Sequence, residues 1–194
     1  MRPAPGEVLH FSEDPTITRF APHVAATSRE SEPYVWAVGA DRCPDYWFPR
    51  DCPRAMAWTV PETTRADRDR IIGAGCGDRV HAIEYRWLDA LRTTRLYAYR
   101  LPADEFRPIG EHAHALVATV PVTPLGPPEP VGDLLAAHEE AGIQLRVMHN
   151  LWSFWDAVLQ TTLGFSGIRL RNALRRKDSV PNLEVHVKGG GPRL

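Results

Sequence analysis

No apolar run in this chain approaches the roughly 20 residues that a helix needs to cross a bilayer. The first residues, Met1 to Gly6, also lack the apolar segment of a secretory signal peptide. We therefore expect a protein without membrane partners that resides in the cytoplasm. The length of 194 residues and the hydrophobic share of 43% fit one globular domain with a substantial core.

Cysteine is scarce as well. The chain has three, Cys43, Cys52 and Cys76, and no Cys-x-x-Cys pair. An odd number without paired spacing argues against a disulfide framework and against a zinc ribbon. We predict three buried thiols that stay reduced.

Three motifs of nucleotide and hydrolase chemistry are absent. No strand is followed by the glycine fingerprint of dinucleotide-binding proteins or by the lysine of a phosphate-binding loop, and there is no Gly-x-Ser-x-Gly elbow. The glycine-rich segment at 73–77 precedes a predicted strand instead of following one. Because glycine readily adopts a positive φ after a helix, we interpret this segment as a connection.

Neither sign of charge is in large excess, since the net charge is −1. The distribution is uneven, because residues 166–194 hold seven lysines and arginines against two acidic residues, which is +5 and leaves −6 for residues 1–165. This split argues against a nucleic-acid partner across the body of the protein. We interpret the basic run IRLRNALRRK at 168–177 as a solvated helix face; contact with phosphates, as in RNA processing, or with an acidic partner is the alternative.

The pattern of short β-rich runs and intervening helices predicts an α+β fold. Seven runs have the alternation or composition of strands, and four segments have helical spacing of apolar residues. The clearest helix is 152–163, which we expect to bury Trp155 and Leu159 against the sheet. The predicted strands are residues 7–11, 34–38, 54–60, 79–83, 95–101, 116–122 and 144–147, and the other predicted helices are residues 64–72, 84–93 and 131–141.

Strands and helices do not alternate regularly along the chain. We therefore expect mixed or antiparallel sheets with flanking helices, and not a doubly wound parallel sheet. Residues 1–187 are predicted to form a single domain, and residues 188–194, KGGGPRL, a flexible tail.

His10 is the first candidate functional residue. It stands where the first predicted strand gives way to Ser12-Glu13-Asp14-Pro15, the composition of a turn. Alternation along a strand puts His10 and Ser12 on one face. There the imidazole can donate a hydrogen bond to a sugar hydroxyl while the serine holds a second polar group. The alternative is a histidine that caps a turn or hydrogen-bonds within the core.

An aromatic cluster with neighbouring cations follows the second predicted strand. Tyr46, Trp47 and Phe48 stand between two prolines, and such a group offers a flat apolar wall for a heterocycle. Arg50 and Arg54 add guanidinium groups that suit a carboxylate or a pyrophosphate. The alternative is a plain core cluster, with Arg50 paired elsewhere in the fold.

The segment Gly110-Glu111-His112-Ala113-His114 precedes a predicted strand, again at a rim. His112 and His114 point to one side if the segment is extended, but no third ligand stands at a diagnostic spacing, so we expect no metal site. Glu111 is a carboxylate that can stabilise an oxocarbenium-like sugar centre. The alternative for Glu111 is an exposed turn residue.

Several runs together resemble an uncharacterised bacterial family of unknown function, over residues 7–173. They are LHFSEDPTITRF, VWAV, DYWFPRDCPR, LYAYRLP, EHAHALVATVPVTP and GFSGIRLRNA. Their layout also resembles the ADP-ribosyltransferase superfamily, in particular the small rifampin ADP-ribosyltransferases. In one branch of that superfamily a first-strand histidine holds the ribose of NAD, a tyrosine stacks on nicotinamide and a later acid supports bond cleavage.

This resemblance implies an ADP-ribosyltransferase-like fold and NAD as the cofactor. The implied reaction transfers ADP-ribose from NAD to an acceptor that the sequence does not identify. The catalytic roles would fall to His10, Tyr46 and Glu111, and NAD binding to His10, Ser12, Tyr46, Trp47 and Arg50, with Trp47 as the substitute for Tyr46 if the register slips by one.

Two features depart from the superfamily pattern. Phe11 replaces the glycine that usually follows the histidine, and residues 61–93 add a helical region. The alternative function is therefore a non-catalytic nucleotide-binding or protein-interaction module on the same fold.

Overall fold

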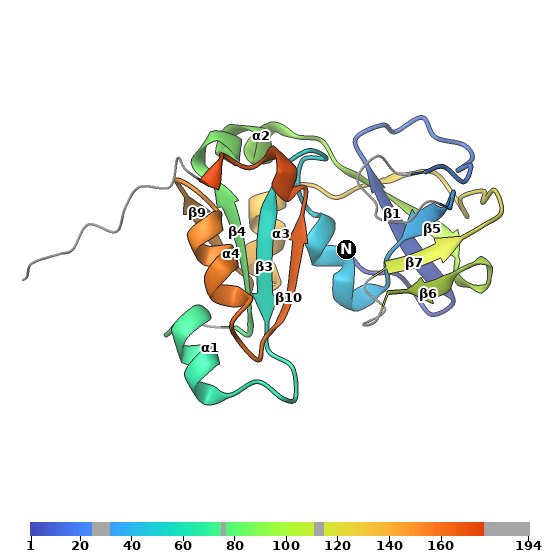
Figure 1. Ribbon diagram of the computed structural model, residues 1–194. Coiled ribbons are helices and arrows are strands. Elements are labelled where there is room, and N and C mark those ends of the chain that lie inside the picture. The colour runs from blue at the N-terminus through green and yellow to red at the C-terminus, as the bar shows by residue number, and fades with distance from the viewer. Residues whose placement is uncertain (25–31, 75–76, 111–114, 177–194) are drawn as a thin grey trace, which may run out of the picture.

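The computed structural model describes residues 1–24, 32–74, 77–110 and 115–176. Within these ranges the chain forms ten strands in three sheets, four α-helices and four short 3-10 helices (Figure 1). The predicted α+β class with antiparallel and mixed sheets is thus confirmed. The predicted tail at 188–194 lies outside the described residues.

The largest sheet has four strands in the order β10–β3–β4–β9. The central strand β3 (Arg54–Trp58) pairs antiparallel with β10 (Gly164–Ile168) and with β4 (Arg79–Glu84). On its other side β4 pairs parallel with β9 (Gln144–Met148), which makes the sheet mixed. Strand β10 forms an edge of this sheet.

Two antiparallel sheets of three strands each form the other half of the molecule. The first has the order β1–β5–β8, and the second has the order β2–β7–β6. One buried apolar cluster contains side chains of both sheets, and backbone hydrogen bonds between Leu9 and Val38 link them. The strands are β1 (Glu7–Ser12), β5 (Tyr97–Pro102), β8 (Glu129–Pro130), β2 (Val35–Ala37), β7 (Ala115–Ala118) and β6 (Arg107–Ile109).

Four short α-helices complete the fold. α1 (Arg65–Ile71) and α4 (Trp152–Val158) pack on one face of the four-stranded sheet, and α3 (Leu134–Glu140) packs on the other. α2 (Leu88–Thr93) continues the 3-10 turn η2 (Tyr85–Trp87). The first turns of α1 and α3 are capped in the expected way, because the side chains of Thr64 and Asp133 accept backbone N–H groups there.

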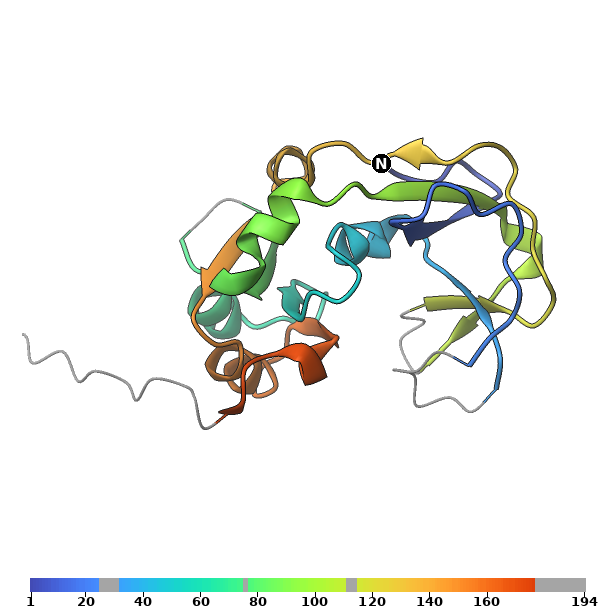
Figure 2. The same cartoon turned by 90° about the horizontal axis from the view of Figure 1, so that it is seen from above.

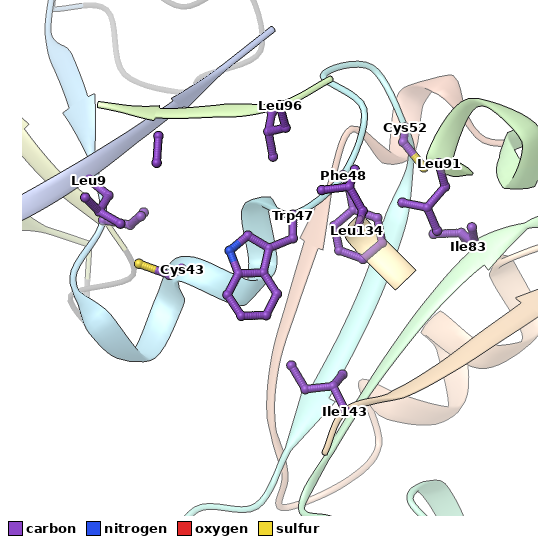
Figure 3. Close-up of a cluster of buried hydrophobic side chains, with 12 residues drawn as sticks. Leu9, Cys43, Trp47, Phe48, Cys52, Ile83, Leu91, Leu96, Leu134 and Ile143 are labelled. Carbon is purple, nitrogen blue, oxygen red and sulfur yellow. The ribbon is translucent and has the colours of Figure 1, made fainter. Parts of the chain in front are cut away.

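The core beside α3 positions the aromatic segment predicted to carry functional residues. Trp47 and Phe48 directly follow the 3-10 helix η1 (Ala40–Tyr46). They belong to the same buried cluster as Ile83 and Leu134 (Figure 3). Both aromatic rings are buried. Because these two neighbours are anchored, the positions of Tyr46 and of the loop before β3 are fixed as well.

Figures 1 and 2 show the two halves side by side, with η1 between them. The chain passes from one half to the other several times: β1 and β2 belong to one, β3 and β4 to the other, and β5 returns to the first. Figure 2 shows α2 leading into β5 across the top of the molecule. Neither half is therefore a continuous segment of the chain.

All seven predicted strands and all four predicted helices are present, with shifted ends. Sequence reasoning missed β6, β8 and β10. β6 and β8 have only three and two residues and contain proline, and β10 contains two glycines, so none of them has the length or the uninterrupted run of β-branched and aromatic residues that marks a strand.

The expectation for 152–163 is wrong in two respects. The helix ends at Val158, and the residues that it buries are Phe154 and Val158, whereas Leu159 is 47% exposed and Trp155 is half-buried. Residues four positions apart share a helix face, so the inward stripe passes through Phe154 and Val158. Leu159 stands at the helix end, where its side chain turns to solvent.

Gly73 and Gly77 bear out the interpretation of the glycine-rich connection. Their φ angles are +76° and +87°, which L-residues rarely adopt. A Cβ atom on Gly77 would also collide with the backbone oxygen of Gly142. In the described part of the chain, no helix has the length and apolar character needed to span a membrane.

Candidate functional site

A pocket of about 560 Å³ lies between the two halves of the molecule. Its wall comes from β1, the end of β2, the aromatic segment, the start of β3 and the end of β10. Residues far apart in sequence, such as His10, Arg54 and Ile168, therefore meet in one place. A volume of this size is typical of sites for small molecules and cofactors.

The structure brings together four of the six predicted site residues. His10, Ser12, Tyr46 and Arg50 all line the pocket. Trp47 does not line it, and Glu111 lies outside the described residues.

His10 lies within β1 and not at its very end. Its Nδ1 atom is 2.7 Å from the carbonyl oxygen of Trp36. Because a carbonyl oxygen only accepts, Nδ1 carries a proton and donates. Burial lowers the pKa of His10, so the ring is neutral near pH 7 and Nε2 is an acceptor. The sequence-based expectation of a donor to a sugar is thus reversed, since the neutral ring can accept from a hydroxyl.

Ser12 is the last residue of β1 and is buried. Its Oγ accepts the backbone N–H of Asp14 at 3.1 Å. The serine therefore caps the turn after β1, and its own O–H remains a donor at the pocket.

Tyr46 ends η1 and is half-buried at the pocket wall. The guanidinium carbon of Arg54 lies 5.7 Å from the centre of its ring and 5.1 Å from that of Phe48. Burial raises the pKa of Tyr46, so its hydroxyl stays protonated at neutral pH. The wall thus combines two aromatic rings with one cation.

Trp47 belongs to the core. It is 4% exposed, and its ring packs edge-on against His138 with the ring centres 5.9 Å apart. The role of substitute for Tyr46 therefore does not fit its position.

Arg50 is exposed and is held by its backbone. Its N–H donates to the carboxylate of Glu13 at 2.7 Å, and its carbonyl accepts from Nε of Arg169 at 3.2 Å. The next residue, Asp51, accepts through its carbonyl from the side-chain amide of Asn172 at 2.8 Å. These bonds tie the loop before β3 to the ends of β1 and β10.

Arg54 is the first pocket residue that sequence reasoning noticed but did not assign. It is 3% exposed and lines the pocket. Its Nε donates to the carbonyl of Asp45 at 2.8 Å and its Nη1 to the carbonyl of Cys52 at 3.0 Å. The available signal was an arginine at the head of the apolar strand RAMAW, because a strand buried on both faces rarely begins with a charge.

Arg169 is the second such residue. The predicted solvated helix at 168–177 is wrong, because β10 ends at Ile168, Arg169 takes a left-handed φ of 56°, and the turn η4 (Leu170–Asn172) follows. This geometry brings Arg169 to the pocket. No local pattern marks it, because its place depends on the long-range pairing of β10 with β3.

A buried polar cluster lies behind the pocket wall. Asp45 is fully buried and lies 3.1 Å from Nε of Arg42, 2.9 Å from Nη1 of Arg79 and 3.5 Å from Nε2 of His81. Burial alone would raise the pKa of Asp45, but the contacts with His81 and the two arginines outweigh it and hold the pKa below its ordinary value.

The cluster continues to α3. Nδ1 of His81 lies 3.1 Å from Nε2 of His138, and Nδ1 of His138 donates to a backbone carbonyl at 2.7 Å. Both histidines are buried, and burial lowers the pKa of each, to about 4 for His138. Phe48, which lines the pocket, packs against both rings at 5.6 and 4.8 Å.

A wider and more open hollow of about 1550 Å³ meets the first pocket at Gly167. It contains Trp58, whose ring has the guanidinium groups of Arg42 and Arg79 over it at 4.2 and 4.8 Å. Both cations already pair with Asp45. None of the predicted site residues lines this hollow, so the smaller pocket is the better candidate.

Metal binding is not indicated within the described ranges, where no group of three or more His, Cys, Asp or Glu could hold an ion. His112 and His114 lie outside those ranges.

The structure is that of an α+β protein with a pocket of small-molecule size between a four-stranded sheet and a pair of three-stranded sheets. The chain belongs to the family of unknown function DUF6886, whose sequence model matches residues 9–173. The expected membership of an uncharacterised family is thus confirmed. No curated protein and no solved structure matches the chain.

Proposed function

We propose that the protein binds NAD in the pocket between its two halves and transfers ADP-ribose to an acceptor. The observation that carries the proposal is the convergence of His10, Ser12, Tyr46 and Arg50 on one pocket. They come from β1, from η1 and from the loop before β3. The ADP-ribosyltransferase-like arrangement and the cytoplasmic location are parts of this proposal.

Each residue has a role that its chemistry allows. Nε2 of His10 accepts from a ribose hydroxyl, the Ser12 hydroxyl donates to a second polar group, and the ring of Tyr46 stacks on nicotinamide. Arg50 holds a phosphate of the dinucleotide. As nicotinamide leaves, the carboxylate of Glu111 stabilises the oxocarbenium-like ribose until the acceptor attacks.

The second candidate is a non-catalytic module that holds a nucleotide or a protein partner in the same pocket. The half-buried ring of Tyr46 at the pocket wall, with the Arg54 guanidinium 5.7 Å from its centre, supports a binding role whether or not bond cleavage follows.

Titration calorimetry with NAD and measurement of nicotinamide release together test the proposal. We expect the wild-type protein to bind NAD and to release nicotinamide. In Glu111→Gln, which keeps size and hydrogen bonding but removes the charge, turnover should fall while the Kd for NAD stays the same, because the lost interaction forms mainly in the transition state. Binding without release would favour the non-catalytic module, and no NAD binding by folded protein would overturn the assignment of NAD.

A further inference from the structure

We infer that Arg54 is the centre of an oxyanion subsite in this pocket, which takes a phosphate or pyrophosphate group. The inference rests on the proposed nucleotide pocket and adds the chemical group that the pocket recognises. It concerns a residue to which neither the sequence resemblance nor the proposed mechanism gives a role.

Arg54 is a buried cation that forms no ion pair with the residues of the described ranges. It is 3% exposed, and among the residues that the structure describes no carboxylate pairs with it. Its hydrogen-bond partners in these ranges are two backbone carbonyls, those of Asp45 and Cys52. Removing a charge from water is costly unless an opposite charge replaces the water, and the pKa of Arg54 is lowered by burial accordingly.

The guanidinium also keeps donors for a ligand. Nε and Nη1 are engaged, while Nη2 has no hydrogen-bond partner in the described part of the chain. Nη2 is also not one of the buried side-chain nitrogen and oxygen atoms that lack a hydrogen-bond partner. Because Arg54 lines the pocket, Nη2 can donate to a group bound there.

The surroundings favour a phosphate over a single carboxylate. Arg50 and Arg169 also line the pocket, and the one acidic residue in the described lining, Glu13, already accepts from the backbone of Arg50. Arg169 also lies 4.0 Å from the carboxylate of Asp51, so the excess of positive charge in the described lining comes mainly from Arg54 and Arg50. Such an excess suits a ligand with more than one negative charge, and guanidinium forks match phosphate oxygens.

The neighbouring hollow offers a contrast within the same molecule. Its arginines, Arg42 and Arg79, both pair with the buried Asp45. Their charge is thus compensated by a paired carboxylate, whereas no carboxylate of the described residues forms an ion pair with Arg54. A ligand anion therefore gains most beside Arg54.

The test is calorimetric titration of the wild-type protein, Arg54→Gln and Arg65→Gln with inorganic pyrophosphate, with phosphate and with acetate. Arg65→Gln is the matched control, because it removes one positive charge from an exposed side chain on α1. We expect pyrophosphate to bind the wild type more tightly than acetate does. Arg54→Gln should weaken it by about tenfold to a hundredfold, the range for lost hydrogen bonds to a charged group, and Arg65→Gln should leave it unchanged.

If Arg54→Gln, which loses hydrogen bonds to two backbone carbonyls, does not fold, two other measurements replace it. The first is titration of Arg54→Lys, which retains the charge. The second follows the NMR signal of the Arg54 Nε–H in the wild-type protein. A shift of this signal that saturates with pyrophosphate and is absent with acetate supports the subsite.

Three results would overturn the inference: no pyrophosphate binding by the wild type, equal binding by folded Arg54→Gln, or equal affinity for acetate. The outcome is separable from that for the proposed function. Pyrophosphate binding that depends on Arg54 without NAD cleavage would leave the subsite in place and remove the transferase. Cleavage of NAD by the wild type, together with unaltered pyrophosphate binding in Arg54→Gln, would support the transferase and remove the Arg54 subsite.

Discussion

At the scale of single residues, His10 is the side chain whose state the structure defines best. The carbonyl of Trp36 fixes the proton on Nδ1, and burial lowers the pKa, so the neutral ring offers Nε2 to a ligand. His10→Ala removes this acceptor, and we expect NAD binding to weaken by about 1–3 kcal/mol. Calorimetry measures this, with His149→Ala as the control, because His149 is exposed and does not line the pocket. An unchanged affinity in folded His10→Ala would remove His10 from the site.

The cysteines give a second prediction for single residues. Cys43 and Cys52 are free and fully buried, which confirms the predicted thiols at these positions, while Cys76 lies outside the described residues. Burial raises the pKa of both thiols to about 12, so they are protonated at pH 8 and react slowly. We expect iodoacetamide to modify them only after unfolding in guanidinium, as mass spectrometry of the two peptides would show. Rapid modification of the native protein would contradict the burial of these side chains.

At the scale of the elements, α4 packs on the sheet with a different face from the one that its local apolar spacing predicted. Phe154 and Val158 point into the core under β3 and β4, and Leu159 points to solvent. Phe154→Ala should therefore lower the free energy of unfolding by about 3–5 kcal/mol, as large-to-small changes in a core do. Leu159→Ala is the matched control and should change it by less than about 0.5 kcal/mol. Urea unfolding measures both, and equal effects of the two changes would mean that the helix is rotated.

The loop before β3 shows how elements build the pocket. Its aromatic residues are neighbours in sequence but divide between two environments, because Trp47 packs on α3 while Tyr46 faces the pocket. The backbone bonds of Arg50 then join this loop to Glu13 and Arg169. The site therefore depends on the packing of Trp47 on α3 and on the hydrogen bonds of the Arg50 backbone to Glu13 and Arg169. The strands alone do not form it.

At the scale of the whole molecule, the buried histidines make global stability depend on pH. The folded-state pKa of His138 is about 4, below its ordinary value of 6.5, so the unfolded chain binds the proton more readily. Stability from this source is complete above pH 6.5 and is lost as the pH falls toward 4. The loss for His138 alone is at most about 3 kcal/mol, from 1.36 kcal/mol per pKa unit.

Urea unfolding at several pH values between 4 and 7 tests this dependence. We expect the stability of the wild type to fall with acidification and the slope to be smaller in His138→Gln. His149→Gln, which alters an exposed histidine, should keep the slope of the wild type. A slope that His138→Gln leaves intact would assign the acid sensitivity to other groups.

The sequence alone determined the fold class and much of the site. Alternating apolar residues predicted seven strands, because a half-buried strand must alternate, and the helical spacing predicted four helices. The His-x-Ser step of the first strand, Tyr46 of the aromatic segment and the neighbouring Arg50 gave four predicted residues that line the pocket, because side chains near the ends of elements are the ones that a rigid scaffold presents to a ligand.

Only the tertiary structure decided which of these side chains meet and in what state. The pairing of β10 with β3 brings Arg169 beside Tyr46, and the carbonyl of Trp36 selects the tautomer of His10. Arg54 is buried, and no carboxylate of the described residues pairs with it. These are contacts between distant segments, and a periodic pattern records which face of an element is apolar but not which element covers it.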